Sequence, residues 1–510
     1  MLNPVLSHAP VLAIVAPLIA GPLCMLLGRR SIAFGISLIC TLISVVMSLY
    51  LVSLVWNGAV LSYHIGGWAP PLGIEYRIDA ANALVLTIVS TVALVALPYA
   101  RTSIENEIAS KNHTLFYACY MLCFTGLMGV TITGDAFNVF VFLEVSSLST
   151  YVLVALGAEK DKRALSAAYD YLIMGTIGAT FFVIGLGMLY MATGTLNLVD
   201  LSQRLITMEG NRTVRSAFAF IVIGMGLKMA MYPLHRWLPG AYSYAPSVIS
   251  ALLAATATKV ALYVVLRFMF SVFSTKFGFE RETVQLIFFP FALVAMFVAS
   301  IIAAYQINVK RLLAYSSLAQ IGYMLLGLSL FTVTGVSATL VHMFNHAMTK
   351  GALFLAIGAI IYRVGSPLLP QMAGLGRQMP WTCAAVVLGG VSLIGVPGTV
   401  GFISKWVLIN AALEEQLWPI AFLIVLSSLI AIVYVWKIVE TLYLKPASGE
   451  NVVAEVPLTM LIPIWLLTAA VIWFGFSASS TLQIANLAAE SLFSGFYGAD
   501  AIIMGVEGRP

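Results

Sequence analysis

The stretch GLKMAMYPLHRWLPGAYSYAPSVISALLAATATKVALY (226–263) is apolar enough to cross a lipid bilayer twice, yet it carries Lys228 and Lys259. Two further lysines, Lys350 and Lys405, lie in other apolar stretches. A cation at the centre of a bilayer costs about 2.5–3.5 kcal/mol, so the four lysines together cost on the order of 10 kcal/mol. Packing alone does not require such groups, and we therefore expect them to carry charge.

The composition of the whole chain is that of a membrane protein. Of its 510 residues, 61% are hydrophobic and only 9% are charged, and the mean hydropathy is +0.99. Apolar runs of about 20 residues predict about fourteen transmembrane helices. They lie near residues 9–28, 32–56, 80–100, 115–133, 136–157, 165–192, 216–238, 247–270, 284–304, 312–332, 334–362, 381–411, 417–442 and 456–479. Because these runs are continuous rather than alternating, we expect an all-α polytopic membrane protein and not a β-barrel, with residues 1–510 in one integral membrane domain.

The formal net charge of +5 does not predict nucleic-acid binding, because the basic residues are scattered along the chain. Most of them fall in alternate loops, which the positive-inside rule assigns to the cytoplasm. These residues are Arg29, Arg30, Lys160, Lys162, Arg163, Lys310, Arg311, Arg363 and Arg377. Both termini are then expected outside, although Arg204, Arg212 and Arg215 oppose the rule. The start, MLNPVLSHAP, lacks the basic region of a cleaved signal peptide, so we expect the first span to be retained.

The sequence carries no pattern of a cofactor enzyme. Its five cysteines all lie within predicted spans and form no C-x-x-C pair, so we infer no disulfide, haem attachment or iron–sulfur cluster. No strand is predicted, and no phosphate-binding or dinucleotide fingerprint follows one. We therefore expect no cofactor and no catalytic residue. The energy must come from an ion gradient or from another subunit.

Two predicted spans contain residues that break helices. The breakers are Pro233 in the seventh span and Pro397, Gly398 and Gly401 in the twelfth. Proline removes a backbone donor and clashes with the preceding turn, so both helices are expected to open in mid-membrane, next to Lys228 and Lys405. The freed backbone groups need water or polar partners, which predicts a hydrated cavity.

The two broken spans are five apart, and an odd offset inverts the direction of a helix in the membrane. We therefore predict two inverted five-helix repeats, spans four to eight and nine to thirteen. This divides the chain into N-terminal helices (1–114), a first repeat (115–270), a second repeat (284–442) and a C-terminal helix and tail (443–510).

A carboxylate and two histidines accompany the lysines. Glu144 lies in the fifth span, and a carboxylate that faces a buried lysine favours its charged form, so their separation can control proton binding. His342, His346 and Lys350 recur at i, i+4 and i+8, which places them on one helix face. The two histidines lack a third ligand, so no metal site is predicted. The alternative that Glu144 and Lys228 form a purely structural ion pair is left open. Lys437 and Glu440 are expected to extend to the membrane surface.

Several long motifs then identify a family. They are GLKMAMYPLHRWLPGAYSYAPSVISALLAATATKVALY (226–263), NVKRLLAYSSLAQIGYMLLGL (308–328), LVHMFNHAMTKGALFL (340–355) and GVPGTVGFISKW (395–406). In this order they resemble the antiporter-like subunits of respiratory complex I, membrane-bound hydrogenases and the multisubunit Mrp sodium/proton antiporters. The resemblance covers residues 75–445. WLPGAYSYAP with Tyr242 looks more like the D-type subunit of the Mrp antiporters than like a complex I subunit.

The resemblance implies a proton path along the membrane midplane. Its members are Glu144 paired with Lys228, then Lys259, then His342, His346 and Lys350, and finally Lys405 nearest an exit. It also implies a location in a prokaryotic cell membrane and other membrane subunits as obligate partners.

The expected function is that of a proton-conducting, non-redox subunit of a monovalent cation/proton antiporter, with sodium as the expected cation. The same proton module in complex I or a membrane hydrogenase is the alternative. An intramembrane enzyme would need a nucleophile and base or a cofactor ligand set, and the sequence provides neither. For Asp170 two roles stay open, an entry group that attracts cations and an ion-pair partner of Arg163.

Overall fold

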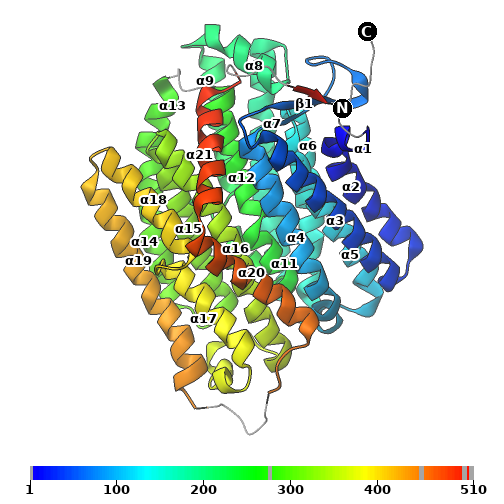
Figure 1. The fold of residues 1–510 in the computed structure, drawn as a ribbon, viewed down its shortest axis with the longest axis vertical. Coiled ribbons are helices and arrows are strands. Elements are labelled where there is room, and N and C mark those ends of the chain that lie inside the picture. Colours follow the sequence, from blue (N-terminus) through cyan, green and yellow to red (C-terminus); the bar gives the residue numbers. More distant parts are fainter. Residues whose placement is uncertain (1–3, 274–277, 447–452, 497–501, 505–510) are drawn as a thin grey trace.

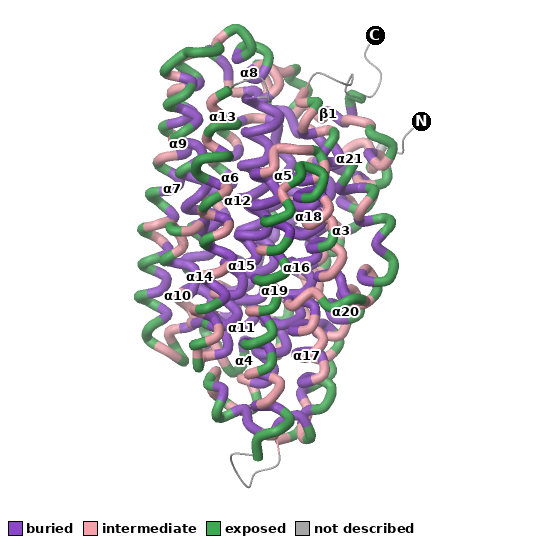
Figure 2. The backbone as a smooth tube through the Cα atoms, turned by 90° about the vertical axis from the view of Figure 1, so that its left-hand side faces the viewer, coloured by how far each residue is buried: buried purple, intermediate pink, exposed green. Residues whose placement is uncertain are grey.

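The structure is a computed structural model, and it describes residues 4–273, 278–446, 453–496 and 502–504. Its helices run roughly along one long axis and pack into a single bundle (Figure 1). Buried residues fill the interior and exposed residues cover the outside (Figure 2). The exposed side chains are largely apolar, such as Leu26, Met191 and Phe422, as expected of a surface that contacts lipid.

Within the described ranges, twelve helical segments are long and apolar enough to cross a membrane. Their helices are α2 (Ala9–Leu27), α3 (Arg30–Val55), α4 (Ala80–Glu107), α5 (His113–Ile132), α6 (Ala136–Ala155), α7 (Arg163–Thr193), α11 (Ser247–Ala255) with α12 (Ala257–Leu266), α14 (Phe289–Tyr305), α15 (Val309–Ser329), α16 (Val333–Val364), α19 (Trp418–Val439) and α20 (Leu458–Phe476). The prediction of an all-α polytopic membrane protein is confirmed. Shorter helices are α1 (Pro4–Ser7), α8 (Leu198–Leu205), α13 (Gly278–Thr283) and α21 (Ser479–Ser494).

Two more crossings consist of interrupted helices. Helix α9 (Arg212–Lys228) is followed after eight residues by α10 (Trp237–Tyr244). Helix α17 (Pro380–Ile394) is followed after five residues by α18 (Val400–Glu414). If each pair counts as one crossing, the twelve segments above and these two give the fourteen expected crossings.

The eighth span lies where the sequence predicts it, near 247–270, but it contains an interruption that the sequence analysis did not predict. Helix α11 ends at Ala255, α12 begins at Ala257, and Thr256 between them has φ −125° and ψ −58°. The Thr256 hydroxyl donates to the Leu252 carbonyl oxygen at 2.6 Å. Such a bond to the residue four positions earlier bends a helix. The span ends in a π-helical turn, Arg267–Val272.

Helix α16 occupies the centre of the bundle. It contacts seven other helices, α4, α11, α15, α17, α18, α20 and α21. Every residue from Gly335 to Ile360 is buried. A polar side chain on α16 therefore needs protein or water partners.

A small sheet closes the end of the bundle at which both termini lie (Figure 1). Strand β1 (Leu61–His64) pairs antiparallel with β2 (Glu75–Ile78) and parallel with β3 (Ile502–Met504), in the order β2-β1-β3. The expectation of no strands is wrong here. The strands are only three or four residues long, at or below the shortest run of about four residues in which alternation is recognisable.

The predicted basic loops gather at the opposite end of the bundle. Lys160 and Lys310 line one cavity together with Tyr362 at the end of α16. Arg30 pairs with Glu105 at the end of α4, at 2.6 Å. Arg163 pairs with Asp161 at 2.6 Å and Asp170 is exposed, so of the two alternatives left open for Asp170, the pair with Arg163 is not formed.

Candidate functional site

The first candidate group joins α6 to the end of α9. Lys228 is the last residue of α9, and its Nζ lies 3.3 Å from Oε1 of Glu144 and donates to the Ser147 hydroxyl at 2.6 Å. Glu144 and Ser147 lie three residues apart and so share one face of α6. The Lys228 side chain is 7% exposed and that of Glu144 is 26% exposed. The lysine is thus held inside the bundle, while its carboxylate partner reaches the outer face.

Lys259 lies at the unexpected break of the eighth span. It is buried, and its ammonium donates to the carbonyl oxygen of Ala254, in the last turn of α11. The carbonyls at a helix C-terminus carry a partial negative charge, which favours a cation. Opening the helix at Thr256 therefore provides the polar partner that the buried lysine needs.

Two histidines lie one turn apart on α16. The His342 and His346 rings are nearly parallel, 8° apart, with centroids separated by 6.1 Å. Nδ1 of His342 lies 2.9 Å from the Ser404 hydroxyl on α18. Nε2 of His342 and both ring nitrogens of His346 are buried and have no hydrogen-bond partner among the described residues. Buried polar atoms of this kind are normally satisfied by water.

Lys350 lies one turn further along the same face of α16. It is completely buried. Its ammonium donates to the Leu313 carbonyl oxygen at 2.9 Å and to the Ser316 hydroxyl, both on α15. In the described part of the chain no ion pair involves this lysine.

Lys405 lies one turn after the start of α18 and reaches back across the break to the end of α17. Its ammonium donates to the carbonyl oxygens of Leu393 and Ile394, each at 2.9 Å, and to the Ser428 hydroxyl at 3.0 Å. The Tyr323 ring centroid lies 4.8 Å away, within cation–π distance. These contacts satisfy all three donors of the ammonium group.

The structure brings most of these side chains together around α16. Lys259 lies within electrostatic range of His342, His346 and Lys350, and Lys405 lies within range of His342. Tyr323 contacts both Lys405 and His342: its ring centroid lies 4.8 Å from the Lys405 ammonium and 5.7 Å from the centroid of the His342 ring. Lys228 belongs to a separate group, which is connected to the rest through the packing of α9 on α12.

The predicted helix breakers lie in different environments. Pro233 lies between α9 and α10, and Pro397 and Gly398 lie between α17 and α18. Gly398 has φ +86°, which favours glycine. Gly401, in contrast, lies inside α18, so its assignment to the break is wrong. A Cβ at this position would lie 1.8 Å from the Ser392 carbonyl oxygen, so Gly401 permits close packing of the two half-helices.

The sequence analysis did not identify several residues that contact the buried lysines and His342. Ser316, Tyr323, Ser404 and Ser428 hold the buried amines and imidazole, yet serine and tyrosine are common packing residues of membrane helices. Each lies far along the chain from the residue that it contacts, so only the fold shows that the two are partners. Lys437 donates to the carbonyl oxygens of Ala304 and Gln306 and therefore caps α14.

No metal site was found in the described ranges, because no group of three or more His, Cys, Asp or Glu side chains is suitably placed. The described cysteines are all free. The carboxylate, amine and imidazole groups of this site are of kinds that can gain and lose protons.

The chain is similar to known membrane proteins over nearly its whole length. NADH-quinone oxidoreductase subunit N of Desulforudis audaxviator is 36% identical over 92% of this chain and 96% of that protein. The Na(+)/H(+) antiporter D subunit of Alkalihalophilus pseudofirmus is 28% identical over 96% of this chain and 97% of that protein. A chain of the Mrp complex from Dietzia sp. DQ12-45-1b is 25% identical, with a TM-score of 0.86 and coverage of 96% of this chain and 98% of that chain.

A family model described as "NADH:quinone oxidoreductase/Mrp antiporter, TM" matches residues 133–431, more than half of the chain. That region contains Glu144, both histidines of α16 and the four lysines of the predicted proton path, Lys228, Lys259, Lys350 and Lys405. The chain therefore belongs to the family of NADH:quinone oxidoreductase/Mrp antiporter membrane subunits, as its sequence motifs indicated.

Proposed function

We propose that the chain is the proton-conducting subunit of a multisubunit monovalent cation/proton antiporter in a prokaryotic cell membrane. Sodium is the cation we expect, carried with the help of partner subunits. The names of the Na(+)/H(+) antiporter relative and of the Mrp complex support this assignment. The protons would move along Glu144, Lys228, Lys259, His342, His346, Lys350 and Lys405.

The observation that carries the proposal is how the buried amines are held. Lys259, Lys350 and Lys405 donate to backbone carbonyls and serine hydroxyls, and no described carboxylate pairs with them. A permanent counter-ion would fix a lysine in its charged form. Neutral acceptors stabilise the ammonium less strongly, so each amine can both take up and release a proton. This arrangement suits transfer better than a purely structural role.

Glu144 can act as the control element for Lys228. At an effective dielectric constant near 20, unit charges about 4 Å apart interact by about 4 kcal/mol. Moving the carboxylate away removes this energy and makes proton release from Lys228 easier. Glu144 is free to respond to a neighbouring subunit because its side chain is partly exposed on the face of α6.

The unpartnered imidazoles support a hydrated connection between the lysines. His346 offers two ring nitrogens without a described partner and His342 offers one. A water molecule makes about three hydrogen bonds in such a site. Imidazole exchanges protons near neutrality, so a water next to each ring completes a transfer path.

The internal symmetry and the orientation are further parts of the proposal. The interruptions between α9 and α10 and between α17 and α18 are consistent with inverted repeats over 115–270 and 284–442. The basic loops gather at one end and both termini at the other. By the positive-inside rule, the termini would face outward.

The test is cation-linked proton exchange in everted vesicles that contain the assembled complex. Lys228→Ala and Lys405→Ala should each abolish exchange while assembly persists. Lys437→Ala is the matched control, because this lysine also donates to two carbonyls but lies away from α16. Wild-type exchange in Lys228→Ala or Lys405→Ala would refute the assignment.

A second candidate is the same proton module in a redox-linked complex. It is favoured by the 36% identity to a protein named as NADH-quinone oxidoreductase subunit N. Mild solubilisation followed by metal analysis decides between the two. Stoichiometric iron in the purified complex would support the redox-linked assembly, and an iron-free complex that exchanges sodium for protons would support the antiporter.

A further inference from the structure

Helix α9 ends at Lys228 in a strained turn. The Ala230 N–H donates to the Leu227 carbonyl oxygen at 3.2 Å, and the Met231 N–H donates to the Gly226 carbonyl oxygen at 2.8 Å. This is the Schellman arrangement, in which the first residue after the cap takes a positive φ and is usually glycine. Here that residue is Ala230, with φ 59°. An alanine in the left-handed region is strained, so the turn needs support from its surroundings.

Trp237, the first residue of α10, is placed to give that support. Its Nε1–H donates to the Leu227 carbonyl oxygen at 2.9 Å, across the eight residues that separate the two helices. Trp237 is only 2% exposed, and a buried N–H that loses its acceptor is costly. Leu227 directly precedes Lys228 in the chain. A fixed Leu227 carbonyl therefore also fixes the backbone from which the Lys228 side chain extends.

Two tyrosines hold the Trp237 ring in place. It stacks on Tyr171 of α7, with ring centroids 4.1 Å apart and planes 4° apart. Tyr171 in turn meets Tyr151 of α6 edge to face, with centroids 4.9 Å apart. Both geometries are favourable for aromatic pairs. The Tyr151 hydroxyl lies against Gly175 of α7, where a Cβ would be 2.0 Å from its oxygen. The three rings are thus anchored on both α6 and α7.

The contacts of this aromatic column return to Lys228 through α6. Tyr151 follows Ser147 by four residues, so the two share one face of α6 and lie close together. The Ser147 hydroxyl accepts a hydrogen bond from the Lys228 amine at 2.6 Å. The backbone before Lys228 and the amine at the end of its side chain are therefore tied to α6 by separate routes. Both routes bear on the 3.3 Å separation of the amine from Oε1 of Glu144.

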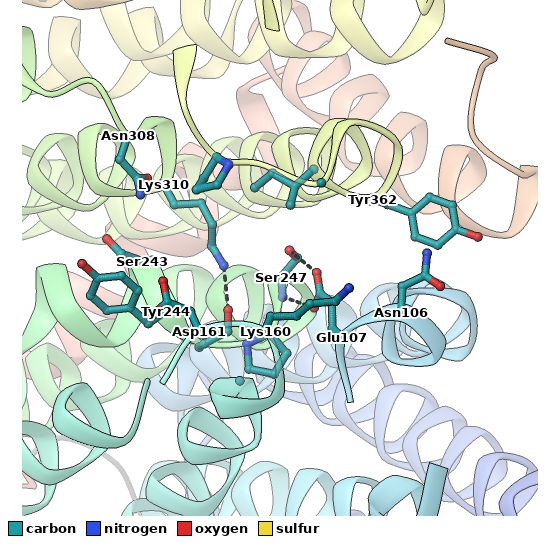
Figure 3. Close-up of a pocket in the computed structure, with 16 residues that line it drawn as sticks. Asn106, Glu107, Lys160, Asp161, Ser243, Tyr244, Ser247, Asn308, Lys310 and Tyr362 are labelled. Carbon is teal, nitrogen blue, oxygen red and sulfur yellow. Dashed lines mark hydrogen bonds between the residues drawn. The ribbon is translucent and has the colours of Figure 1, made fainter. Parts of the chain in front are cut away.

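The other end of α10 is fixed as well. Tyr244, its last residue, lies under the Arg163 guanidinium, 4.7 Å from the ring centroid, which is a cation–π contact. Figure 3 shows Tyr244 at the wall of a cavity of about 240 Å³, which Glu107 and Lys310 also line. Because α10 is held at both ends, it gives Trp237 a firm base.

The electrostatic surroundings of Lys228 are simple. Helices α7 and α12 pack on α9. On α7, Gly178 faces the lysine, since a Cβ there would lie 3.5 Å from Lys228 Cγ. Among the described residues, the charge that acts on the amine is that of Glu144. A change in the pH dependence of Lys228 therefore reports on its separation from Glu144. Other titratable groups on the elements around the break do not act on this amine, namely Asp170 on α7, His235 between α9 and α10 and Lys259 on α12.

We propose that Trp237 is a positioning residue, which holds the end of α9 so that the Lys228 amine stays within reach of Glu144. The hydrogen bond from the indole to Leu227 stabilises the strained turn. Without the indole N–H, the end of α9 shifts and the amine lies further from the carboxylate. The charged form of Lys228 then loses part of its stabilisation. The inference rests on the proposed function and adds the residue that sets the distance within its first ion pair.

The first test is Trp237→Phe in the assembled complex, with exchange measured in everted vesicles over a range of pH. Phenylalanine keeps a ring that stacks on Tyr171 but has no N–H. We expect exchange to fall severalfold and its pH optimum to move to lower pH, because Lys228 then releases its proton more readily. Trp465→Phe is the matched control, because this buried indole N–H has no hydrogen-bond partner among the described residues. A wild-type rate and pH optimum in Trp237→Phe would overturn the proposal.

The second test separates positioning from packing. Trp237→Phe is combined with Glu144→Gln, which removes the charge next to which Lys228 is held. If Trp237 acts through this pair, the pH optimum of the double variant equals that of Glu144→Gln alone, because the effects of coupled residues are not additive. A packing role would either leave the pH optimum unmoved in both backgrounds or add the same shift to both. Either result would overturn the proposal.

The third test relieves the turn. Glycine adopts a positive φ without strain, so Ala230→Gly should restore part of the exchange that Trp237→Phe loses and return the pH optimum toward that of wild type. No recovery would refute the link between the indole and the strained turn. If Trp237→Phe does not assemble, Tyr171→Leu removes the ring that the indole stacks on and should move the pH optimum in the same direction. An unmoved optimum in Tyr171→Leu would count against the proposal equally.

The failure of this inference can be told from failure of the proposed function. If Lys228→Ala abolishes exchange while Trp237→Phe keeps the wild-type rate and pH optimum, the proposed function stands and the positioning role is wrong. If Lys228→Ala keeps exchange, the proposed function itself fails.

Discussion

Replacing Glu144 by glutamine tests the control of proton binding at Lys228 most directly. The amide is nearly the same size as the carboxylate and can still accept a hydrogen bond, so packing between α6 and α9 is kept. The substitution removes only the negative charge that lies 3.3 Å from the Lys228 amine. The remaining partner of the amine is the Ser147 hydroxyl at 2.6 Å.

The size of the effect follows from that separation. Coulomb's law at an effective dielectric constant of 20 gives about 5 kcal/mol for unit charges at 3.3 Å. Each 1.36 kcal/mol changes an equilibrium tenfold, so the protonation equilibrium of Lys228 shifts by a factor on the order of a thousand toward the neutral amine. We expect exchange to fall at least tenfold and its pH optimum to move to lower pH.

Exchange is measured from the collapse of a pH gradient in everted vesicles on addition of sodium, over a range of pH. Glu440→Gln is the matched control, because Glu440 pairs with Lys445 at 3.8 Å with both side chains well exposed. Exposed pairs of this kind contribute about 0–1 kcal/mol. Wild-type rate and pH profile in Glu144→Gln, with assembly verified, would refute the role of the carboxylate.

Three further predictions concern stability and transport. Burial disfavours the charged Asp79 carboxylate, but Arg267, which donates to both carboxylate oxygens at 2.7 and 2.8 Å, outweighs burial and lowers the pKa of Asp79. Asp79→Asn should therefore cost about 3–5 kcal/mol of stability at pH 7. Calorimetry should find that the difference in stability between wild type and Asp79→Asn narrows as the pH falls below about 4, because the wild-type carboxylate then becomes protonated. Gly401→Ala should lower the thermal stability of the complex, because the added methyl group collides with the Ser392 carbonyl oxygen; an unchanged melting temperature would contradict the close packing. His346→Leu should leave stability unchanged, because both ring nitrogens lack a protein partner, but should lower exchange at least tenfold; normal exchange would remove His346 from the path.

The sequence predicted what depends on local composition. Each span is decided by its own run of about twenty residues, because the cost of placing it in lipid is nearly additive along the run. Pro233 and Pro397 marked two interruptions, because proline acts on its own helix. The interruption at Thr256 was missed, since a threonine that bends its helix has the same local sequence as one that does not.

The site was only partly predictable. Lys228 and Glu144 lie together as the resemblance implied. The acceptors of Lys405, in contrast, come from the end of α17 and from Ser428 on α19, and no spacing in the sequence connects them. Only the folded chain brings these segments into contact. The cavity at Glu107 was likewise missed, because its walls come from five separate segments of the chain.

The three hydrogen bonds of Lys405 would couple its protonation to the packing of the two half-helices. A neutral amine has two N–H groups instead of three, so on deprotonation one of its three acceptors must lose its donor. Two of these acceptors are the terminal carbonyls of one half-helix, and the lysine belongs to the other half. If the bond lost on deprotonation is one to Leu393 or Ile394, release of the proton would weaken the contact between α17 and α18, and its return would restore that contact.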